Sequence, residues 1–443
     1  MPAIEDPGRL VRPDSVHRSV YTDPSVFKLE MERIYGQAWI YVGHESEIRG
    51  AGDYRLSRIG DQDVILVRAA DHQVHVLYNR CPHRGIEILG EGKGCVGRTI
   101  RCPYHGWTFR LDGTHVGTPL RDGLAGTAFD PAHPDFSMRR VARIDSHRGF
   151  VFASQADHGP DLRSFLGGVI TSIDNLCDRS PEGEVEVAGG GYRVMHDSNW
   201  KFFYENVIDM MHPFVTHQSI WSAARKKSRE IGNLPMELQI GEGLGAPYQT
   251  WEQLELRAYG NGHGILGNIF LGVGLDLDPV SKAHFESLAK VHGAERAAQI
   301  LGLARHNTIL YGSGALQTTF QLFRILRPLA VDRTLQEVQL FRLKGAPDSV
   351  FRRALLFANV AFSPASTIMP DDMELYRRGQ AGNRLQGGDW ISLHRHHGSD
   401  VDLNDSRLAK NGTSELLIRE QYRAWQALMR GNAANAGQGL PAC

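Results

Sequence analysis

The chain has few cysteines, no long apolar run and almost no net charge. Five cysteines among 443 residues are too few and too scattered for a disulfide scaffold. The longest apolar runs fall well short of about 20 residues, which excludes a membrane-spanning helix, and the N-terminus lacks the apolar core of a signal peptide. A net charge of −1 gives no indication of a nucleic acid or an anionic membrane as partner. These absences predict a cytoplasmic protein.

The pattern of residue types changes twice along the chain, which divides it into three regions. Residues 1–38 predict an opening arm followed by a short helix from Pro24. Short β-rich runs separated by Gly, Asp and Asn then predict a small all-β domain over residues 39–156, with a hairpin turn at Asp112-Gly113. Residues 157–443 predict a mixed α+β domain built on an antiparallel sheet.

Within the mixed domain, several segments have a clear periodicity. Helices are predicted over residues 160–178, 279–305, 347–363 and 414–430. Two strands joined by V-D-R-T are predicted over residues 318–343, and two strands around a glycine turn over residues 184–196. The last residues of the chain are predicted to fray.

The most specific motif is a repeated pairing of cysteine with histidine. C-P-H and, eighteen residues later, C-P-Y-H each place one thiolate and one imidazole in a loop after a β-run; the four residues are Cys81, His83, Cys102 and His105. A Rieske [2Fe–2S] centre needs two cysteines and two histidines. A zinc finger normally has its cysteines and its histidines as separate pairs, which does not fit this spacing. The motif therefore predicts a Rieske cluster.

The other cysteines have no histidine at a ligand-like spacing. Cys95 lies between the two halves of the motif but is predicted to be an ordinary buried or turn cysteine, as are Cys177 and Cys443. The sequence also lacks a G-x-G-x-x-G fingerprint after a strand, so it offers no flavin or nicotinamide site of its own. Electrons for a redox reaction must then come from another protein.

A second candidate site lies in the stretch N-W-K-F-F-Y-E-N-V-I-D-M-M-H-P-F-V-T-H at residues 199–217. Written as one helix, Glu205, Asp209 and His212 share a face, whereas His217 lies on a different side. Pro213 kinks or restarts the helix between the two histidines, which could bring His217 back towards His212. Two neutral imidazoles among aromatic and methionine side chains suit a 2-His-1-carboxylate iron site.

Such an iron site needs a carboxylate from elsewhere in the chain. The acidic run after Pro370 is the best candidate, and spacing alone leaves Asp371, Asp372 and Glu374 open. The same run also fits a helix start with Asp371 as its cap. Two further histidine-bearing segments, H-R-H-H at 394–397 and N-G-H-G at 261–264, are predicted to be a surface loop and a plain turn.

Taken together, C-P-H-R-G, C-P-Y-H-G-W, the 199–217 stretch and D-D-M-E at 371–374 closely resemble the large (alpha) subunit of Rieske non-haem iron aromatic-ring-hydroxylating oxygenases. The likeness spans nearly the whole chain. It implies an all-β Rieske domain and a larger, helix-grip-like catalytic domain of antiparallel sheet and helices.

The resemblance also implies a role for individual residues. Cys81, His83, Cys102 and His105 match the cluster ligands, and His212, His217 and Asp372 match the ligands of the mononuclear Fe(II). Asp209 matches an acid that, in this family, links His212 to the cluster histidine of a neighbouring subunit. The residues expected to line the substrate pocket are Phe202, Phe203, Asn206, Met210, Met211 and Phe214.

The family further implies a reaction and partners. Electrons from NAD(P)H would arrive through a reductase or ferredoxin, and both atoms of O2 would add to an arene as a cis-dihydrodiol. Aromatic carboxylates such as anthranilate, salicylate or cumate are the favoured substrates, and an arginine or a polar side chain should then hold the carboxylate. The expected assembly is an α3β3 complex with a small beta subunit, with an α3 homotrimer as the alternative. Alternative activities are a Rieske monooxygenase (a salicylate-type hydroxylase or a demethylase) and, less favoured, a non-catalytic electron carrier.

Overall fold

A computed structural model describes residues 6–231, 234–267, 278–303 and 305–431. The chain forms two compact units. One unit is Tyr35–Leu162, and the other combines Met1–Ile34 with Arg163–Cys443. The expected α+β class, with a small all-β domain and a larger domain of antiparallel sheet and helices, is confirmed.

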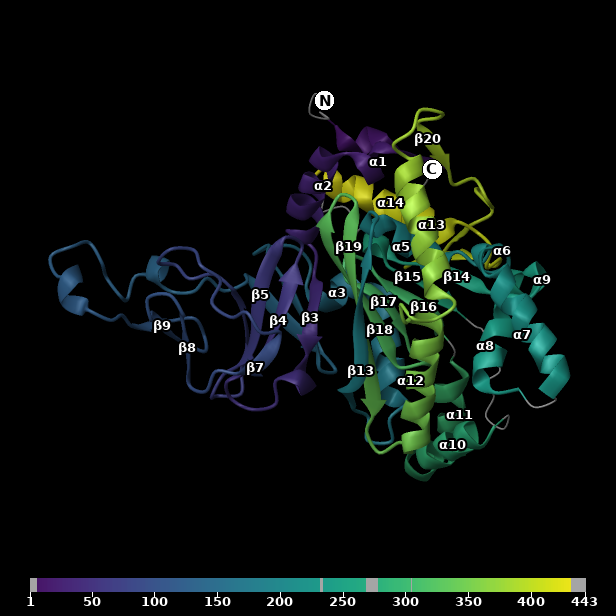
Figure 1. The fold of residues 1–443 in the computed structure, drawn as a ribbon, viewed down its shortest axis with the longest axis horizontal. Helices are drawn as coiled ribbons and strands as arrows, with labels where there is room; N and C mark the ends of the chain where they lie inside the picture. Colours follow the sequence, from purple (N-terminus) through teal and green to yellow (C-terminus); the bar gives the residue numbers. More distant parts are fainter. Residues whose placement is uncertain (1–5, 232–233, 268–277, 304, 432–443) are drawn as a thin grey trace. The chain divides into compact units, whose positions relative to one another are not determined.

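The smaller unit is built from three antiparallel sheets (Figure 1). Their orders are β6-β5-β4-β7, β10-β9-β8 and β11-β12-β3. The strands are β3 (Ile40–His44), β4 (Asp53–Ile59), β5 (Gln62–Arg68), β6 (Val74–Tyr78), β7 (Lys93–Cys95), β8 (Thr99–Arg101), β9 (Thr108–Arg110), β10 (His115–Gly117), β11 (Arg143–His147) and β12 (Phe150–Ser154). The predicted Asp112-Gly113 turn joins β9 to β10, with Gly113 at φ +90° and the Arg110 amide donating to the Thr114 carbonyl over 2.8 Å.

The larger unit is organised on a nine-stranded sheet of order β13-β19-β18-β17-β16-β15-β14-β22-β21. All of its neighbouring strands pair antiparallel. The strands are β13 (Val185–His196), β14 (Glu255–Ala258), β15 (Gly264–Gly267), β16 (Arg305–Leu310), β17 (Gly314–Gln317), β18 (Leu322–Ala330), β19 (Arg333–Leu343), β21 (Val401–Asp402) and β22 (Arg407–Ala409). A separate small sheet joins β1 (Val11–Arg12), β2 (Ser15–His17) and β20 (Trp390–Ser392).

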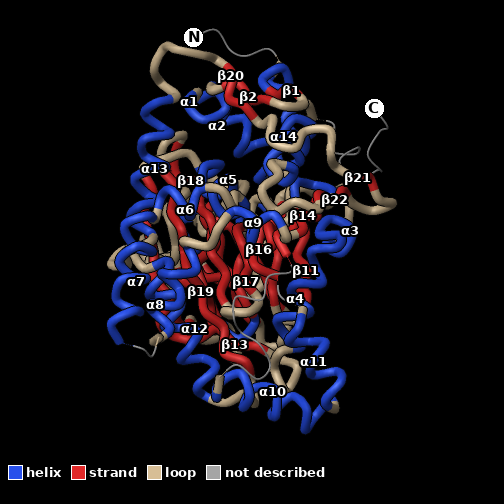
Figure 2. Tube along the Cα trace, turned by 90° about the vertical axis from the view of Figure 1, so that its right-hand side faces the viewer, coloured by secondary structure: helices blue, strands red, loops and turns tan. Residues whose placement is uncertain are grey.

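Helices flank this sheet, with α10 and α11 near one end and α14 near the other (Figure 2). The helices are α1 (Ser19–Thr22), α2 (Pro24–Glu30), α3 (Leu162–Leu166), α4 (Ile170–Asp178), α5 (Trp200–Ile208), α6 (His212–Thr216), α7 (Gln218–Ile231), α8 (Met236–Leu244), α9 (Tyr248–Glu252), α10 (Pro279–His292), α11 (Ala294–Gly302), α12 (Asp348–Phe362), α13 (Met369–Gly382) and α14 (Leu416–Met429). None of the helices in the described ranges is long and apolar enough to cross a membrane.

The glycine run in residues 189–191 does not form the predicted turn between two strands. It is a bulge within the single strand β13, because the pairing with β19 shifts between Ala188 and Tyr192. Gly190 has φ +93°, and a Cβ at Gly191 would lie 2.5 Å from the Val338 carbonyl oxygen. Residues without a Cβ let the bulged backbone approach the neighbouring strand.

A buried carboxylate fixes helix α5 against the N-terminal arm and α14. Glu30 is fully buried and accepts hydrogen bonds from Lys201 Nζ over 2.5 Å, Trp200 Nε1 over 2.9 Å and Trp425 Nε1 over 2.7 Å. A buried charge is tolerated when it is paired and hydrogen-bonded in this way. The arm therefore holds the helix that precedes the second candidate site.

Two buried histidines predict that the protein loses stability in mild acid. Burial lowers the pKa of His263 and of His284 to about 4. The unfolded chain, with histidine pKa values near 6.5, binds more protons between these limits, so stability falls as the pH drops from about 6.5 towards 4. Each shift is worth up to about 3 kcal/mol. Thermal unfolding followed across this range should show a falling midpoint, and a shallower fall in His284→Gln. A midpoint that does not change between pH 7 and 5 would contradict the prediction.

Candidate metal centres

The stretch 199–217 forms two helices rather than one kinked helix. Asn199 caps α5 through its side chain, and α5 ends at Ile208 because Asp209 is extended, with φ −91° and ψ 114°. Helix α6 then starts at His212, and Pro213 lies in its first turn, where a missing amide donor costs nothing. Of the two alternatives predicted at Pro213, the helix restarts rather than kinks, and the restart lies one residue before the proline, at His212.

This break removes Glu205 from the candidate metal site. The Glu205 carboxylate accepts hydrogen bonds of 2.6 Å from both the Tyr21 and the Tyr422 hydroxyl groups. Burial raises the pKa of Glu205, and these two donors partly offset the rise. The shared helix face predicted for Glu205, Asp209 and His212 does not exist, since α5 has ended before Asp209.

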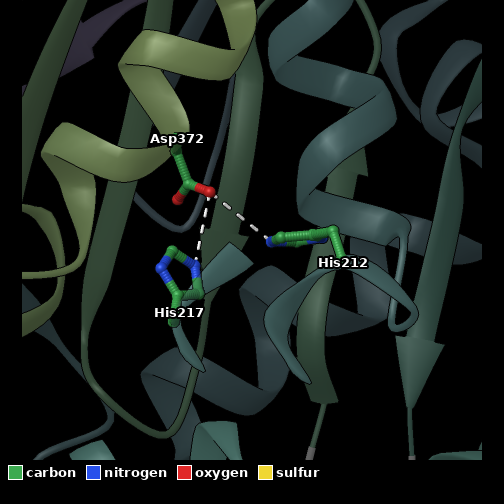
Figure 3. A group of neighbouring side chains, drawn as sticks. All are labelled: His212, His217 and Asp372. Carbon is green, nitrogen blue, oxygen red and sulfur yellow. Dashed lines mark ion pairs between the residues drawn. The ribbon is translucent and has the colours of Figure 1, made fainter. Parts of the chain in front are cut away.

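The structure brings His212, His217 and Asp372 together (Figure 3). In the part of the chain that is described, theirs is the one group of three or more histidine, cysteine or acidic side chains whose ligand atoms all lie within 4.8 Å of one another. Asp372 Oδ1 lies 3.6 Å from His212 Nε2 and 3.4 Å from His217 Nε2. Two imidazoles and one carboxylate facing a common point are the donor set that non-haem iron prefers.

The second nitrogen of each imidazole is held by a hydrogen bond. His212 Nδ1 donates to the backbone carbonyl of Asp209 over 2.8 Å, and His217 Nδ1 donates to Asp371 Oδ2 over 3.2 Å. These bonds place the proton on Nδ1 and leave Nε2 free to bind a cation. Asn206 Nδ2 donates to Asp372 Oδ1 over 3.1 Å and orients the carboxylate.

The protonation states of Asp372 and His212 suit a cation, whereas His217 tends to keep a second proton. Burial acts to raise the pKa of Asp372, but its contacts with the two histidines outweigh burial and hold the pKa below its ordinary value. Burial lowers the pKa of His212, with partial compensation from Asp372. Burial also acts to lower the pKa of His217, but the hydrogen bonds and charges of Asp372 and Asp371 outweigh it and raise that pKa. Because a metal ion coordinates an ionised carboxylate and neutral imidazoles, its binding would displace the second proton of His217.

The three acids left open by spacing have separate environments. Helix α13 starts at Met369 with no side-chain cap, so Asp371 is not the predicted cap; it lies in the first turn and contacts His217 instead. Glu374 is directed to Arg377 and Arg378, which lower its pKa to about 2. Asp372 is the acid whose oxygen faces both histidines.

Asp209 occupies the extended position between α5 and α6. Its backbone carbonyl, not the expected carboxylate, holds His212. The carboxylate accepts from the Met211 amide over 2.7 Å and lies 4.0 Å from Arg395 Nη1. About a third of the Asp209 side chain is exposed, so the carboxylate has access to groups outside this chain.

In the smaller unit, the two halves of the Cys/His motif form equivalent loops. The Gly85 amide donates to the Cys81 carbonyl over 2.8 Å, and the Gly106 amide donates to the Cys102 carbonyl over 3.2 Å. Both glycines have φ near +70°, a conformation that disfavours side chains. The two cysteines lie in the buried core of the unit, whereas the histidines at its surface, His83 and His105, have ring centroids 4.8 Å apart.

This arrangement fits a two-iron cluster better than a single ion. Cys81 and Cys102 lie close together, since burial and then the neighbouring Cys102 raise the pKa of the Cys81 thiol. The two thiols thus form one pair in the core, and the two imidazoles form a second pair at the surface. A Rieske cluster has this arrangement, with the cysteines on one iron and the histidines on the other. A zinc site would need all four ligand atoms around one point, and the quartet is not such a group.

The residues predicted to line a substrate pocket have different neighbours. Phe203 is buried beside Arg324, and Asn206 contacts Asp372. Phe202 stacks on Tyr21 with ring centroids 4.6 Å apart, and Phe214 stacks on Trp221 at 5.1 Å. Met210 is buried and Met211 is half-buried at the break between α5 and α6.

The remaining sequence predictions have mixed outcomes. The segment 394–397 is exposed, as predicted, and 261–264 contains a turn in which His263 is buried and accepts from the Tyr311 amide. Cys177 is buried as predicted, but Cys95 is exposed on β7, so that part of the prediction is wrong. Cys443 and most of the predicted frayed tail lie outside the described residues.

Two residues near the metal group have roles that the sequence does not predict. Asp371, a candidate ligand or cap by sequence, instead accepts a hydrogen bond from His217. Arg324 was not singled out, although a charged residue inside the apolar run L-F-R-I-L of β18 was a visible signal. A charge in a buried strand requires a partner or a function.

Comparisons with known proteins identify relatives of this chain. A family model described as Rieske [2Fe-2S] domain matches residues 38–128. Toluate 1,2-dioxygenase subunit alpha of Pseudomonas putida is 30% identical over 430 residues, covering 93% of this chain and 90% of that protein. The N,N-dimethyl phenylurea N-demethylase subunit alpha of Sphingobium sp. is 30% identical over 447 residues, covering 94% and 92%.

Solved structures show the same fold. Naphthalene 1,2-dioxygenase with indole bound matches with a TM-score of 0.80 at 23% identity, covering 96% of this chain and 95% of that one.

Anthranilate 1,2-dioxygenase large subunit of Acinetobacter baylyi is a further sequence relative, 27% identical over 432 residues, covering 94% of this chain and 89% of that protein. The chain therefore belongs to the Rieske non-haem iron aromatic-ring-hydroxylating oxygenases, an oxidoreductase family, and it is a large (alpha) subunit.

Proposed function

We propose that this chain is the terminal oxygenase component of a multicomponent dioxygenase that cis-dihydroxylates an aromatic substrate. The proposal is based on the group His212, His217 and Asp372. The Nδ1 atom of each imidazole is hydrogen-bonded to a residue outside this group, and each Nε2 atom faces the Asp372 carboxylate. The names of several relatives, including those acting on toluate, 2-halobenzoate and anthranilate, favour an aromatic carboxylate as substrate.

Each metal group is assigned its own residues. Cys81, His83, Cys102 and His105 would hold the [2Fe–2S] cluster, and His212, His217 and Asp372 would hold Fe(II). When bound, these groups supply single-electron transfer and O2 activation. The chain itself keeps both iron-binding imidazoles in the Nδ1-protonated form and orients Asp372 through Asn206. Phe203 is buried on α5, the helix that precedes the site.

The proposal extends to domains and partners. Residues 39–156 would be the Rieske domain, residues 157–443 the catalytic domain, and residues 1–38 an arm packing on the latter. Electrons from NAD(P)H would reach the cluster through a ferredoxin or reductase in the cytoplasm. The assembly would be α3β3 or α3. Asp209 would contact His212 through its backbone carbonyl and His105 of a neighbouring subunit through its partly exposed carboxylate, and so link the two.

Turnover in labelled oxygen tests the reaction. The protein loaded with cluster and Fe(II), given a surrogate reductase and ¹⁸O2, should yield an arene product with two labelled oxygen atoms on the ring. One labelled atom would support the second candidate, a monooxygenase, which is favoured by the likeness to the N-demethylase subunit. A purified chain with a cluster EPR signal but no mononuclear iron would exclude both enzymes and leave an electron carrier.

A further inference from the structure

A buried arginine lies on the sheet of the larger unit without a carboxylate partner. Arg324 is on β18, opposite Ala315 of β17 and Val338 of β19, and only 5% of it is exposed. Its guanidinium carbon lies 4.2 Å from the ring centroid of Phe362 and 5.2 Å from that of Phe203. Two aromatic rings therefore lie against the guanidinium.

The guanidinium has far fewer hydrogen bonds than it can make. Nη2 donates to Asn307 Oδ1 over 2.9 Å, whereas the buried Nε has no hydrogen-bond partner. Within the described ranges, Arg324 has no carboxylate within the 4.0 Å of a salt bridge. An arginine offers five N–H donors in a planar fork, so most of its donor capacity is unused.

Two other buried arginines of this chain are better satisfied. Arg419 pairs with Asp400 over 2.9 Å and donates to the Leu393 and Arg395 carbonyls. Arg179 donates to the Asn175 side chain and to two backbone carbonyls. Burial of a cation with as few partners as Arg324 has is unfavourable, so the environment of Arg324 favours an anion supplied from outside the chain.

Arg324 also lies close to the candidate iron site. Burial lowers its pKa to about 10, and Tyr376 and Asp372 act in the opposite direction. The side chain therefore stays charged at neutral pH, within electrostatic reach of Asp372. Its partner Asn307 in turn donates to the Val207 carbonyl over 2.7 Å, near the end of α5.

We propose that Arg324 binds the carboxylate of an aromatic carboxylate substrate and so sets the preference of this enzyme for anionic arenes. The inference rests on the proposed function and assigns the residue that selects its substrate class. The planar guanidinium matches a carboxylate in geometry and charge, and Phe203 and Phe362 provide apolar surface for the ring. Arg324 is thus a specificity-determining residue.

Calorimetric binding of benzoate and of its uncharged analogue benzamide to the metal-loaded protein, without reductant, tests this assignment. In Arg324→Met, benzoate affinity should fall about 10- to 100-fold, as expected for the loss of charge-assisted hydrogen bonds, while benzamide affinity changes less than about threefold. Arg324→Lys keeps the charge and should recover part of the benzoate affinity. The cluster absorbance and thermal midpoint report whether each variant folds.

Arg342→Met is the matched control. Arg342 lies on β19 and forms an exposed ion pair with Asp348 of α12, so this variant removes the same charge from the protein surface. It should leave both affinities unchanged. Wild-type benzoate binding in Arg324→Met, equal losses for benzoate and benzamide, or a wild-type protein that binds benzoate no better than benzamide would overturn the proposal. If Arg324→Met does not fold, Arg324→Lys is compared instead: a larger loss of affinity for benzoate than for benzamide would support the proposal, and equal losses would overturn it. Failure to oxidise any arene would refute the proposed function instead, since binding is measured without turnover.

Discussion

Replacing Asp372 with alanine should abolish arene oxidation and mononuclear iron binding while the cluster remains. Asp372 is the carboxylate whose Oδ1 lies within 3.6 Å of both imidazole Nε2 atoms. Loss of a residue that only supports a ligand costs about 10- to 100-fold, so loss of the ligand itself should lower turnover by more than about 100-fold. Mass spectrometry gives the total iron and EPR of the reduced cluster gives the cluster content, so the mononuclear iron follows from their difference.

Asp371→Ala is the matched control, because it removes the adjacent carboxylate, which contacts only the outer nitrogen of His217. It should lower turnover by about 10- to 100-fold and keep most of the iron. Cys102→Ser should show the reverse metal pattern, with the mononuclear iron retained and the cluster lost. An Asp372→Ala protein that retains stoichiometric mononuclear iron would remove Asp372 from the ligand set.

Replacing Asp209 with alanine should leave both metals in place and still reduce turnover by more than about 100-fold. The backbone carbonyl that holds His212 is kept in this variant, so the substitution removes only the carboxylate. If that carboxylate links the metal centres of neighbouring subunits, electron transfer between them should fail. Stopped-flow reoxidation of the reduced cluster in the presence of O2 and substrate measures this step directly.

Asp209→Asn separates charge from local structure, because the amide oxygen can still accept from the Met211 amide as the carboxylate does. Slow cluster reoxidation in both variants would support the link, and recovery in Asp209→Asn would assign the effect to the break between the helices. Rapid, wild-type reoxidation in Asp209→Ala would remove the bridging role altogether.

Local patterns predicted most of the secondary structure, since short strands, hairpins and long helices depend on nearby residues. The Asp112-Gly113 turn is one example, because its geometry is set within four residues. The glycine run at 189–191 was misread as a turn because a bulge and a turn use the same residue type. Only the pairing of β13 with β19 distinguishes the two.

The sequence leaves the choice between a kink and a restart at Pro213 open for a similar reason. Proline is unfavourable inside a helix and favourable in its first turn, and the sequence does not show which position it occupies. In the structure, the extended backbone of Asp209 ends α5, and a new helix starts at His212, which places Pro213 in a first turn. Glu205 then finds its partners at Tyr21 and Tyr422, which are far away in the sequence.

By itself, the sequence determined the Rieske motif and the pair of iron-binding histidine candidates, because each set lies within short segments whose spacing limits the chemistry. Only the tertiary structure decided which acid faces both histidines, what holds their outer nitrogens, and that Arg324 is buried without a counterion. The residues concerned come from α5, α6, α13 and the sheet. Their distances in space depend on how these elements pack, which cannot be predicted from spacing within one segment of the sequence.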